Sequence, residues 1–256
     1  MKKGFVFLLF IVHQLLSAQV KDTLSLLFVG DIMGHSPQII SAYNKQTKRY
    51  EYEPVFAKVA PIFRENDFVV ANLEVTLGGK PYGLPIPEPT QVNLLDTLQI
   101  KNDLQSAKKL HLDKLIAVVH WGVEYATKPN KAQKEMADFL FKNGIDYIIG
   151  GHPHVLQPME LRSNNSPYTE QFVVYSLGNF VSNQRKSPSD GGAMVSLTLL
   201  KDAHTTRIVD KGYHLVWVNR TKKANGKYLF EILPCKEYEE DNFKDLTEEA
   251  KDSMNI

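Results

Sequence analysis

The sequence is poor in cysteine and lacks clusters of charge of one sign. Among its 256 residues is a single cysteine, Cys235, which excludes an internal disulfide framework and any cysteine-based metal site. We interpret Cys235 as a small packed residue rather than a nucleophile. The formal net charge is +1, and losing Lys2 and Lys3 with a leader would bring it to −1. A near-neutral chain without basic clusters does not support nucleic-acid binding, so we expect no nucleic-acid partner.

Long apolar runs are also scarce, and the one of note lies at the N-terminus. Lys2 and Lys3 precede an apolar stretch at 4–16, which only His13 and Gln14 interrupt, and the small residue Ala18 follows. This pattern predicts a signal peptide at 1–18, cleaved after Ala18. The alternative is a membrane anchor, but the run is short for a span. We therefore expect an exported protein, in the periplasm or cell envelope, that contacts a membrane only through an uncleaved leader.

Two common catalytic motifs are missing. No GxxxxGK followed by Ser or Thr occurs, so a phosphate-cradling loop of that type is excluded. Ser176 follows the apolar run at 172–175, but it lacks the glycine two residues earlier that a nucleophile elbow requires. Serine catalysis is therefore the weaker hypothesis.

What the chain does contain is an alternation of buried strands and amphipathic helices. Apolar runs predict strands at 24–29, 68–71, 115–119, 147–149 and 172–175, and helical spacing predicts helices at 54–68, 96–110 and 131–144. Beyond residue 190 the runs at 193–200, 206–218 and 227–233 predict an antiparallel patch without helices. The expected fold class is therefore α/β with antiparallel strands in the C-terminal part. We place one domain at 19–240 and a charged tail at 241–256.

Polar side chains follow five of these strands. They are Asp31, then Asn72 with Glu74, then His120, then His152 with His154, and finally Asn179. The run at 147–149 is predicted to enter a tight turn at Gly150-Gly151, and two histidines in an extended segment beyond it would point the same way. Oxygen and imidazole ligands without thiolates suit zinc, manganese or iron. Two such ions would clamp a phosphoryl or acyl group and activate water. The alternatives are helix caps, such as Asp31, and polar turns that satisfy backbone groups.

At these positions the chain resembles the CapA-type poly-γ-glutamate (capsule) synthesis proteins, a metallophosphatase-like family. The matching motifs are Gly-Asp-Ile-Met at 30–33, Asn-Leu-Glu at 72–74, His-Trp-Gly-Val-Glu-Tyr at 120–125, Gly-His-Pro-His-Val-Leu-Gln-Pro at 151–158 and Tyr-Ser-Leu-Gly-Asn-Phe at 175–180. They extend over nearly the whole mature chain in the family's order.

The resemblance implies a calcineurin-like α/β/β/α sandwich with a two-metal site at its strand-end loops. The implied metal ligands are Asp31, Asn72, Glu74, His120, His152 and His154. His120 or His154 would lie near the leaving group of a phosphoester or amide, and Glu124, Gln157 and Asn179 would bind substrate. The implied role is capsule or poly-γ-glutamate biosynthesis, export or anchoring. The implied partners are an anionic polymer or small-molecule substrate and other capsule-assembly proteins.

The chain departs from the family's pattern in two places. Met33 stands where phosphatases of the wider superfamily have a histidine, a departure that the CapA group shares. Family members also carry further strand–helix units with an Asn-His element, which this sequence lacks. The sandwich is therefore expected to be reduced by an internal deletion near Gly83. This leaves metal occupancy open, and the alternative function is a non-catalytic polymer-binding or scaffold component of a cell-envelope assembly.

Overall fold

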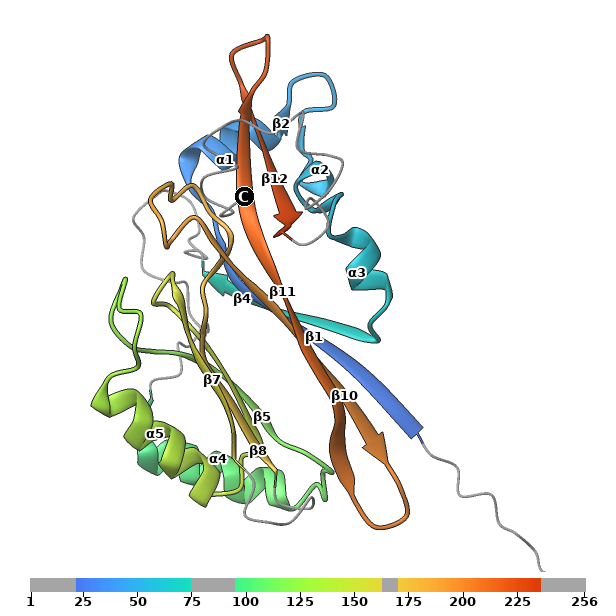
Figure 1. Ribbon diagram of the computed structural model, residues 1–256, viewed down its shortest axis with the longest axis vertical. Coiled ribbons are helices and arrows are strands. Elements are labelled where there is room, and N and C mark those ends of the chain that lie inside the picture. The colour runs from blue at the N-terminus through green and yellow to red at the C-terminus, as the bar shows by residue number, and fades with distance from the viewer. Residues whose placement is uncertain (1–21, 75–94, 163–169, 236–256) are drawn as a thin grey trace, which may run out of the picture.

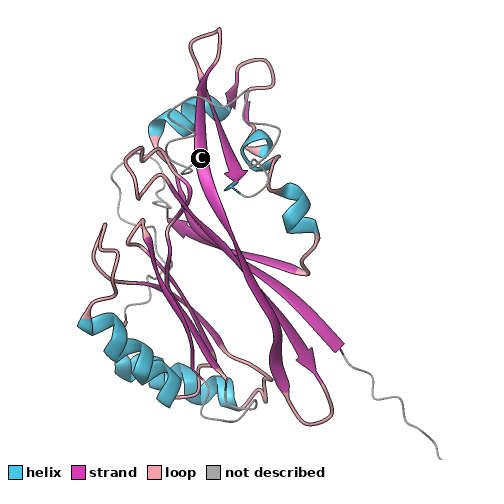
Figure 2. Cartoon of the chain, in the orientation of Figure 1, coloured by secondary structure: helices cyan, strands magenta, loops and turns pink. Residues whose placement is uncertain are grey.

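Two β-sheets pack face to face, and helices cover the outer face of each (Figure 1, Figure 2). The computed structural model describes residues 22–74, 95–162 and 170–235. Between the sheets lies an apolar core to which each contributes large side chains, such as Phe28 from one and Tyr147 from the other. The four layers are α/β/β/α, so the predicted fold class is confirmed.

The first sheet combines parallel and antiparallel strands in the order β12-β11-β10-β1-β4, and β9 also pairs with β1. Its members are β1 (Asp22–Met33), β4 (Phe68–Glu74), β9 (Asn179–Val181), β10 (Gly191–Lys201), β11 (Thr206–Lys222) and β12 (Tyr228–Pro234). β4 and β9 run parallel to β1, whereas β10, β11 and β12 form an antiparallel ladder beside it. The antiparallel patch predicted beyond residue 190 is therefore confirmed.

The second sheet has the order β5-β6-β8-β7. Its members are β5 (Ile116–His120), β6 (Tyr147–Gly151), β7 (Leu156–Arg162) and β8 (Gln171–Leu177). β5, β6 and β8 run parallel to one another, and β7 is antiparallel to β8 at the edge. The carboxyl ends of β5 and β6 therefore lie side by side, which places the segments that follow these two strands next to each other.

The helices α4 (Thr97–Lys108) and α5 (Lys131–Lys142) cover the second sheet. Asp96 caps α4 by accepting from the backbone N–H groups of Leu98 and Gln99, and Gly144, at φ +104°, follows α5. Short helices lie on the other side of the molecule, against the first sheet. They are α1 (Ser36–Ala42), α2 (Glu53–Phe56) and α3 (Ala60–Arg64), accompanied by the hairpin β2 (Tyr43–Asn44) and β3 (Arg49–Tyr50).

Three local predictions need correction. The helix predicted at 54–68 is wrong: the chain forms α2 and α3 instead, because Pro61 has no N–H to donate to the carbonyl of Ala57. The strands β7 and β9 were not predicted, since their short polar and apolar mixtures show no clear alternation. The tight turn predicted at Gly150-Gly151 is also wrong, because both glycines belong to β6.

Several expectations fall outside the described residues. These are the signal peptide at 1–18, the loop and missing segment around Gly83, and the charged tail at 241–256. Within residues 22–74, 95–162 and 170–235, no helix has the length and apolar character needed to cross a membrane.

Candidate metal centre

Asp31 is the buried anchor of a polar cluster where the ends of the two sheets meet. It lies near the end of β1, opposite Asn72 of β4 and Asn179 of β9, and its side chain has no exposed surface. The Asn72 side chain donates a 2.7 Å hydrogen bond to Asp31 Oδ1. The backbone N–H of His152 approaches both carboxylate oxygens, at 3.4 and 3.3 Å. Asp31 is therefore held by donors from both sheets and does not cap a helix.

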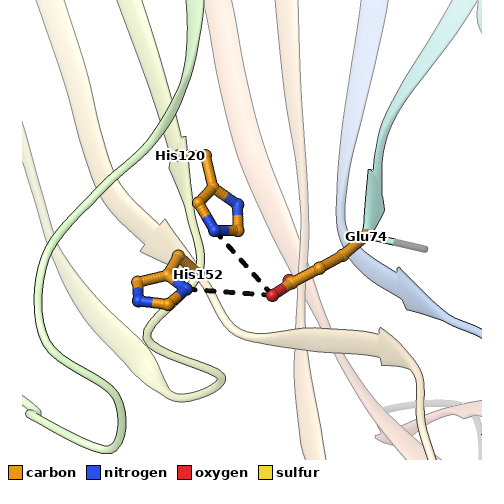
Figure 3. Close-up of side chains that lie close together, drawn as sticks. All are labelled: Glu74, His120 and His152. Atoms are coloured by element: carbon orange, nitrogen blue, oxygen red, sulfur yellow. Dashed lines mark ion pairs between the residues drawn. The ribbon is translucent and has the colours of Figure 1, made fainter. Parts of the chain in front are cut away.

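Three imidazoles converge on Glu74, and Figure 3 shows two of them, those of His120 and His152. Its Oε1 lies 3.6 Å from His154 Nε2, 3.8 Å from His152 Nδ1 and 4.0 Å from His120 Nε2. His120 ends β5 and both His152 and His154 follow β6 of the second sheet, whereas Glu74 ends β4 of the first. The other ring nitrogen of His154, Nδ1, lies 3.2 Å from Asp31 Oδ2. The structure thus brings together all the residues predicted as metal ligands.

The backbone around the two paired histidines is not the extended segment that the sequence predicted. His152 and His154 have φ angles of +97° and +60°, in the left-handed region that side chains rarely adopt. The predicted extended segment is therefore wrong. Both rings nevertheless reach Glu74. Non-glycine residues in this region cluster at functional sites, where the surrounding structure holds them in place.

Gly151 allows the two sheets to approach at this point. A Cβ on Gly151 would lie 2.6 Å from Asp31 Oδ1 and 2.8 Å from Asn72 Nδ2, closer than real Cβ atoms come. A Cβ on Gly150 would similarly lie 2.2 Å from the carbonyl oxygen of Tyr175. The two glycines are therefore required because residues of other strands approach β6 closely at these positions, and not because of a turn.

Charges in the cluster act on one another strongly. Burial would raise the pKa of Asp31, but the contacts with His154 and Asn72 hold it below its ordinary value. Burial and the nearby Asp31 charge raise the pKa of Glu74 to about 7. Burial opposes protonation of His154, yet its contacts with Asp31 and Glu74 raise its pKa. Burial and the neighbouring His152 lower the pKa of His120, which favours its neutral form.

The donor set fits a divalent metal ion. Three overlapping groups have ligand atoms within 4.8 Å of one another; they are Asp31, Glu74 and His154, then Glu74, His120 and His152, and then Glu124, His152 and His154. Donors around a tetrahedral ion at about 2.1 Å lie roughly 3.4 Å apart, close to the separations at Glu74. Glu74 Oε2 and His152 Nδ1 are buried without a hydrogen-bond partner among the described residues. Such atoms are otherwise costly, and a bound cation would satisfy them.

The three residues predicted to bind substrate occupy different environments. Glu124 is exposed and belongs to one of the candidate metal groups. Gln157 is buried, and its amide is engaged at both ends, accepting from Gln133 and donating to the carbonyl of Ala126. Asn179 is fully buried; its amide nitrogen donates to Gln184 and to the carbonyl of Ser189, while its Oδ1 has no partner in the described part of the chain.

Sequence reasoning gave no role to Tyr125. Its ring lies 5.9 Å from that of His154, and its backbone, at φ +65°, donates a 2.8 Å hydrogen bond to the carbonyl of Pro153. Its hydroxyl accepts from Gln184 at 3.3 Å, and the side chain is more than half exposed. The sequence signal for Tyr125 was its place at the end of the matching motif at 120–125, since the left-handed backbone leaves no mark in the composition.

The family model and the curated relatives that match this chain carry names from the same family. The family model described as "Bacterial capsule synthesis protein PGA_cap" matches residues 25–90 and 84–184. These two pieces overlap at residues 84–90, next to Gly83, where the sequence predicts a missing segment. "PGA biosynthesis protein CapA" of Bacillus subtilis (strain 168) is 34% identical over 129 residues, covering 50% of this chain and 26% of the relative. "Capsule biosynthesis protein CapA" of Bacillus anthracis is 37% identical over 127 residues, covering 50% of this chain and 24% of the relative. The matches thus span about a quarter of the length of these curated relatives.

Among solved structures, a protein titled a novel phosphatase, from Mycoplasma pneumoniae, is 13% identical to this chain. The alignment covers 88% of this chain and 99% of that one, with a TM-score of 0.37. At this score the likeness carries no argument, and the fold description rests on the sheets and helices themselves.

Proposed function

The chain belongs to the bacterial capsule synthesis protein family, and we propose that it acts in poly-γ-glutamate biosynthesis through a divalent metal held at the strand-end cluster. The observation that carries the proposal is the convergence of three histidines from the second sheet on Glu74 of the first, beside the buried Asp31. The relatives named for capsule and poly-γ-glutamate biosynthesis support the biological role.

We propose that the most buried members of the cluster hold the metal. Asp31 and His154, with side chains 0% and 3% exposed, are closed to a large substrate. Glu74 and His152 are partly exposed and lie between them and the open side of the cluster. Asn72 acts through Asp31, because its amide orients the carboxylate. When bound, a divalent cation would neutralise substrate charge and lower the pKa of a coordinated water.

His120 is the better placed of the two histidines proposed to act on the leaving group. Its side chain is 51% exposed, so a substrate can reach it, whereas His154 is enclosed between Asp31 and Glu74. Because its pKa is lowered, His120 is neutral near pH 7 and can accept a proton. We therefore propose that His120 takes a proton from the attacking water and returns it to the leaving oxygen or nitrogen of a phosphoester or amide in an anionic substrate, and that His154 holds the metal.

A non-catalytic, polymer-binding role is the second candidate, and Met33 favours it. Met33 pairs with Glu74 across β1 and β4, where the wider superfamily has a histidine, and its thioether is a poor ligand for a hard cation. A centre with fewer ligands would bind carboxylates of an anionic polymer through its metal without turnover. For either role we propose an exported location at the cell envelope, by analogy with the capsule-biosynthesis relatives.

Hydrolysis assays with the purified chain decide between the two roles. We expect metal-dependent hydrolysis of an aryl phosphoester or a γ-glutamyl amide, lost in His152→Ala and reduced in His120→Ala with metal content retained. His111→Ala, which removes an exposed histidine outside the cluster, is the matched control. Binding of poly-γ-glutamate without turnover of either substrate would refute the hydrolase and leave the binding role. Binding that survives metal removal would count against both forms of the proposal.

A further inference from the structure

A cavity lies on the opposite face of β1 and β4 from the metal cluster. Its volume is about 480 Å³, within the range of small-molecule sites, and it lies among α1, α2, the ends of β1 and β4, and β12. Its walls are mostly apolar; they include Ile39, Val55, Phe56, Leu73, Val181 and Phe230. Leu73 lies between Asn72 and Glu74 on β4, and side chains alternate between the faces of a strand, so Leu73 faces away from the cluster.

Two polar features of this cavity lack partners. Gln38 is 94% buried, since its exposed fraction is 6%, and its amide nitrogen has no hydrogen-bond partner among the described residues. Its Oε1 is already used, because it accepts from the backbone N–H of His35 at 3.0 Å. Lys223 also lines the cavity, is exposed, and forms no ion pair within the described ranges. Among the described residues, the amide donor in the wall and the cation at the rim are thus left to bind oxygen atoms of a ligand.

The carboxylate in the same cavity is already satisfied. Glu51 accepts from the Asn44 amide at 2.9 Å and from the Thr47 hydroxyl at 2.8 Å. Its neighbours are therefore neutral donors that belong to the chain itself. Because Glu51 has partners, whereas Lys223 has no ion pair within residues 22–74, 95–162 and 170–235, the cavity favours an anionic head group over a cationic one.

We propose that this cavity binds an amphipathic anion: an alkyl chain among the apolar walls, with a carboxylate or phosphate head at Lys223. A head or ester oxygen would accept from Gln38. Such a ligand would contact Leu73 and Met33, which lie on the strands that carry Asp31, Asn72 and Glu74. The site is distinct from the metal cluster, so its occupancy can be tested without metal or turnover.

Binding of monomeric alkyl anions tests the proposal. We expect decanoate and laurate to bind the purified chain, measured by calorimetry. Each added methylene should tighten Kd about fourfold, the effect of burying one CH₂ group. Dodecanol and dodecyltrimethylammonium, with the same chain and a neutral or cationic head, should bind more weakly than laurate. Vesicles containing phosphatidylglycerol distinguish a membrane lipid from a free acyl anion as the source of the chain.

Three variants locate the ligand. Ile39→Trp fills the cavity and should abolish binding, whereas Ile40→Trp, at a 62% exposed neighbour on the same helix, should not. Lys223→Gln should remove the preference for laurate over dodecanol. The proposal is overturned by a folded chain that binds no laurate, by laurate binding that survives Ile39→Trp, or by a preference for the alkylammonium. Thermal melting of each variant without ligand separates lost binding from lost folding.

Discussion

Replacing Gly151 by alanine should damage the metal cluster without altering any of its ligands. The added Cβ would lie 2.6 Å from Asp31 Oδ1 and 2.8 Å from Asn72 Nδ2, so at least one of these side chains must move. The backbone at Gly151 cannot easily shift to relieve the clash, because Gly151 pairs with His120 across β5 and β6. The hydrogen bond between Asn72 and Asp31 is therefore the contact most directly lost.

The size of the effect follows from that contact. A hydrogen bond to a charged group contributes about 1.5–3 kcal/mol, and groups that orient a metal ligand typically change metal affinity about 10–100-fold. The two ranges agree, since 1.4 kcal/mol is about tenfold in Kd. We therefore expect Gly151→Ala to weaken metal binding by about 10–100-fold and to lower the free energy of unfolding of the metal-free chain.

Competition with a chromogenic chelator would measure the metal affinity, and thermal melting would check the fold. The matched control is Gly212→Ala on β11, where a Cβ would meet only the Ser196 hydroxyl, at 3.2 Å. Metal affinity should be unchanged in that variant. If Gly151→Ala binds metal as tightly as the unaltered chain, the geometry behind Asp31 does not set the affinity and the reasoning fails.

Three other predictions follow, two from the metal cluster and one from the buried Gln157. Because the pKa of Glu74 is raised to about 7 in the folded state and is lower when unfolded, the metal-free chain should lose stability as pH rises from about 4.5 to 7. Glu74→Gln should therefore melt at a higher temperature than the unaltered chain at pH 8 but not at pH 4, and should bind metal poorly; equal melting at pH 8 would contradict the raised pKa. Metal binding should release more protons at pH 6 than at pH 8, seen by calorimetry in buffers of different ionisation enthalpy; release independent of pH would argue against Glu74 as a ligand. Gln157→Leu should lower the free energy of unfolding by about 1–3 kcal/mol by stranding Gln133 and the Ala126 carbonyl, with metal content retained; unchanged stability would show that these bonds contribute nothing.

Much of the sandwich could be predicted because its strands are apolar runs with clear ends. The runs at 147–149 and 172–175 and most of the run at 24–29 are buried between layers, and such strands carry a strong local signal. Pro61 divides the predicted helix at 54–68, and its effect could have been read from the sequence. The strand β9 could not, because its three residues are defined by pairing with β1.

The candidate site was predictable in membership but not in geometry. The polar residues that follow the predicted strands identified Asp31, Glu74 and the three histidines as members of one site, since parallel strands place their carboxyl ends together. The left-handed backbone at His152 and His154 depends on contacts with a different sheet, and such contacts are invisible in a local pattern. The same holds for Gly151, whose missing side chain matters only because Asp31 lies behind it.

The metal content of the purified chain tests the central claim most directly. Elemental analysis should find near-stoichiometric zinc, manganese or iron in the unaltered chain and none in the His152→Ala/His154→Ala double variant. A His111→Ala/His204→Ala double variant, which removes two exposed histidines outside the cluster, should keep its metal. A well-folded chain without metal, or metal retained when both cluster histidines are removed, would contradict the assignment of these side chains as a metal centre.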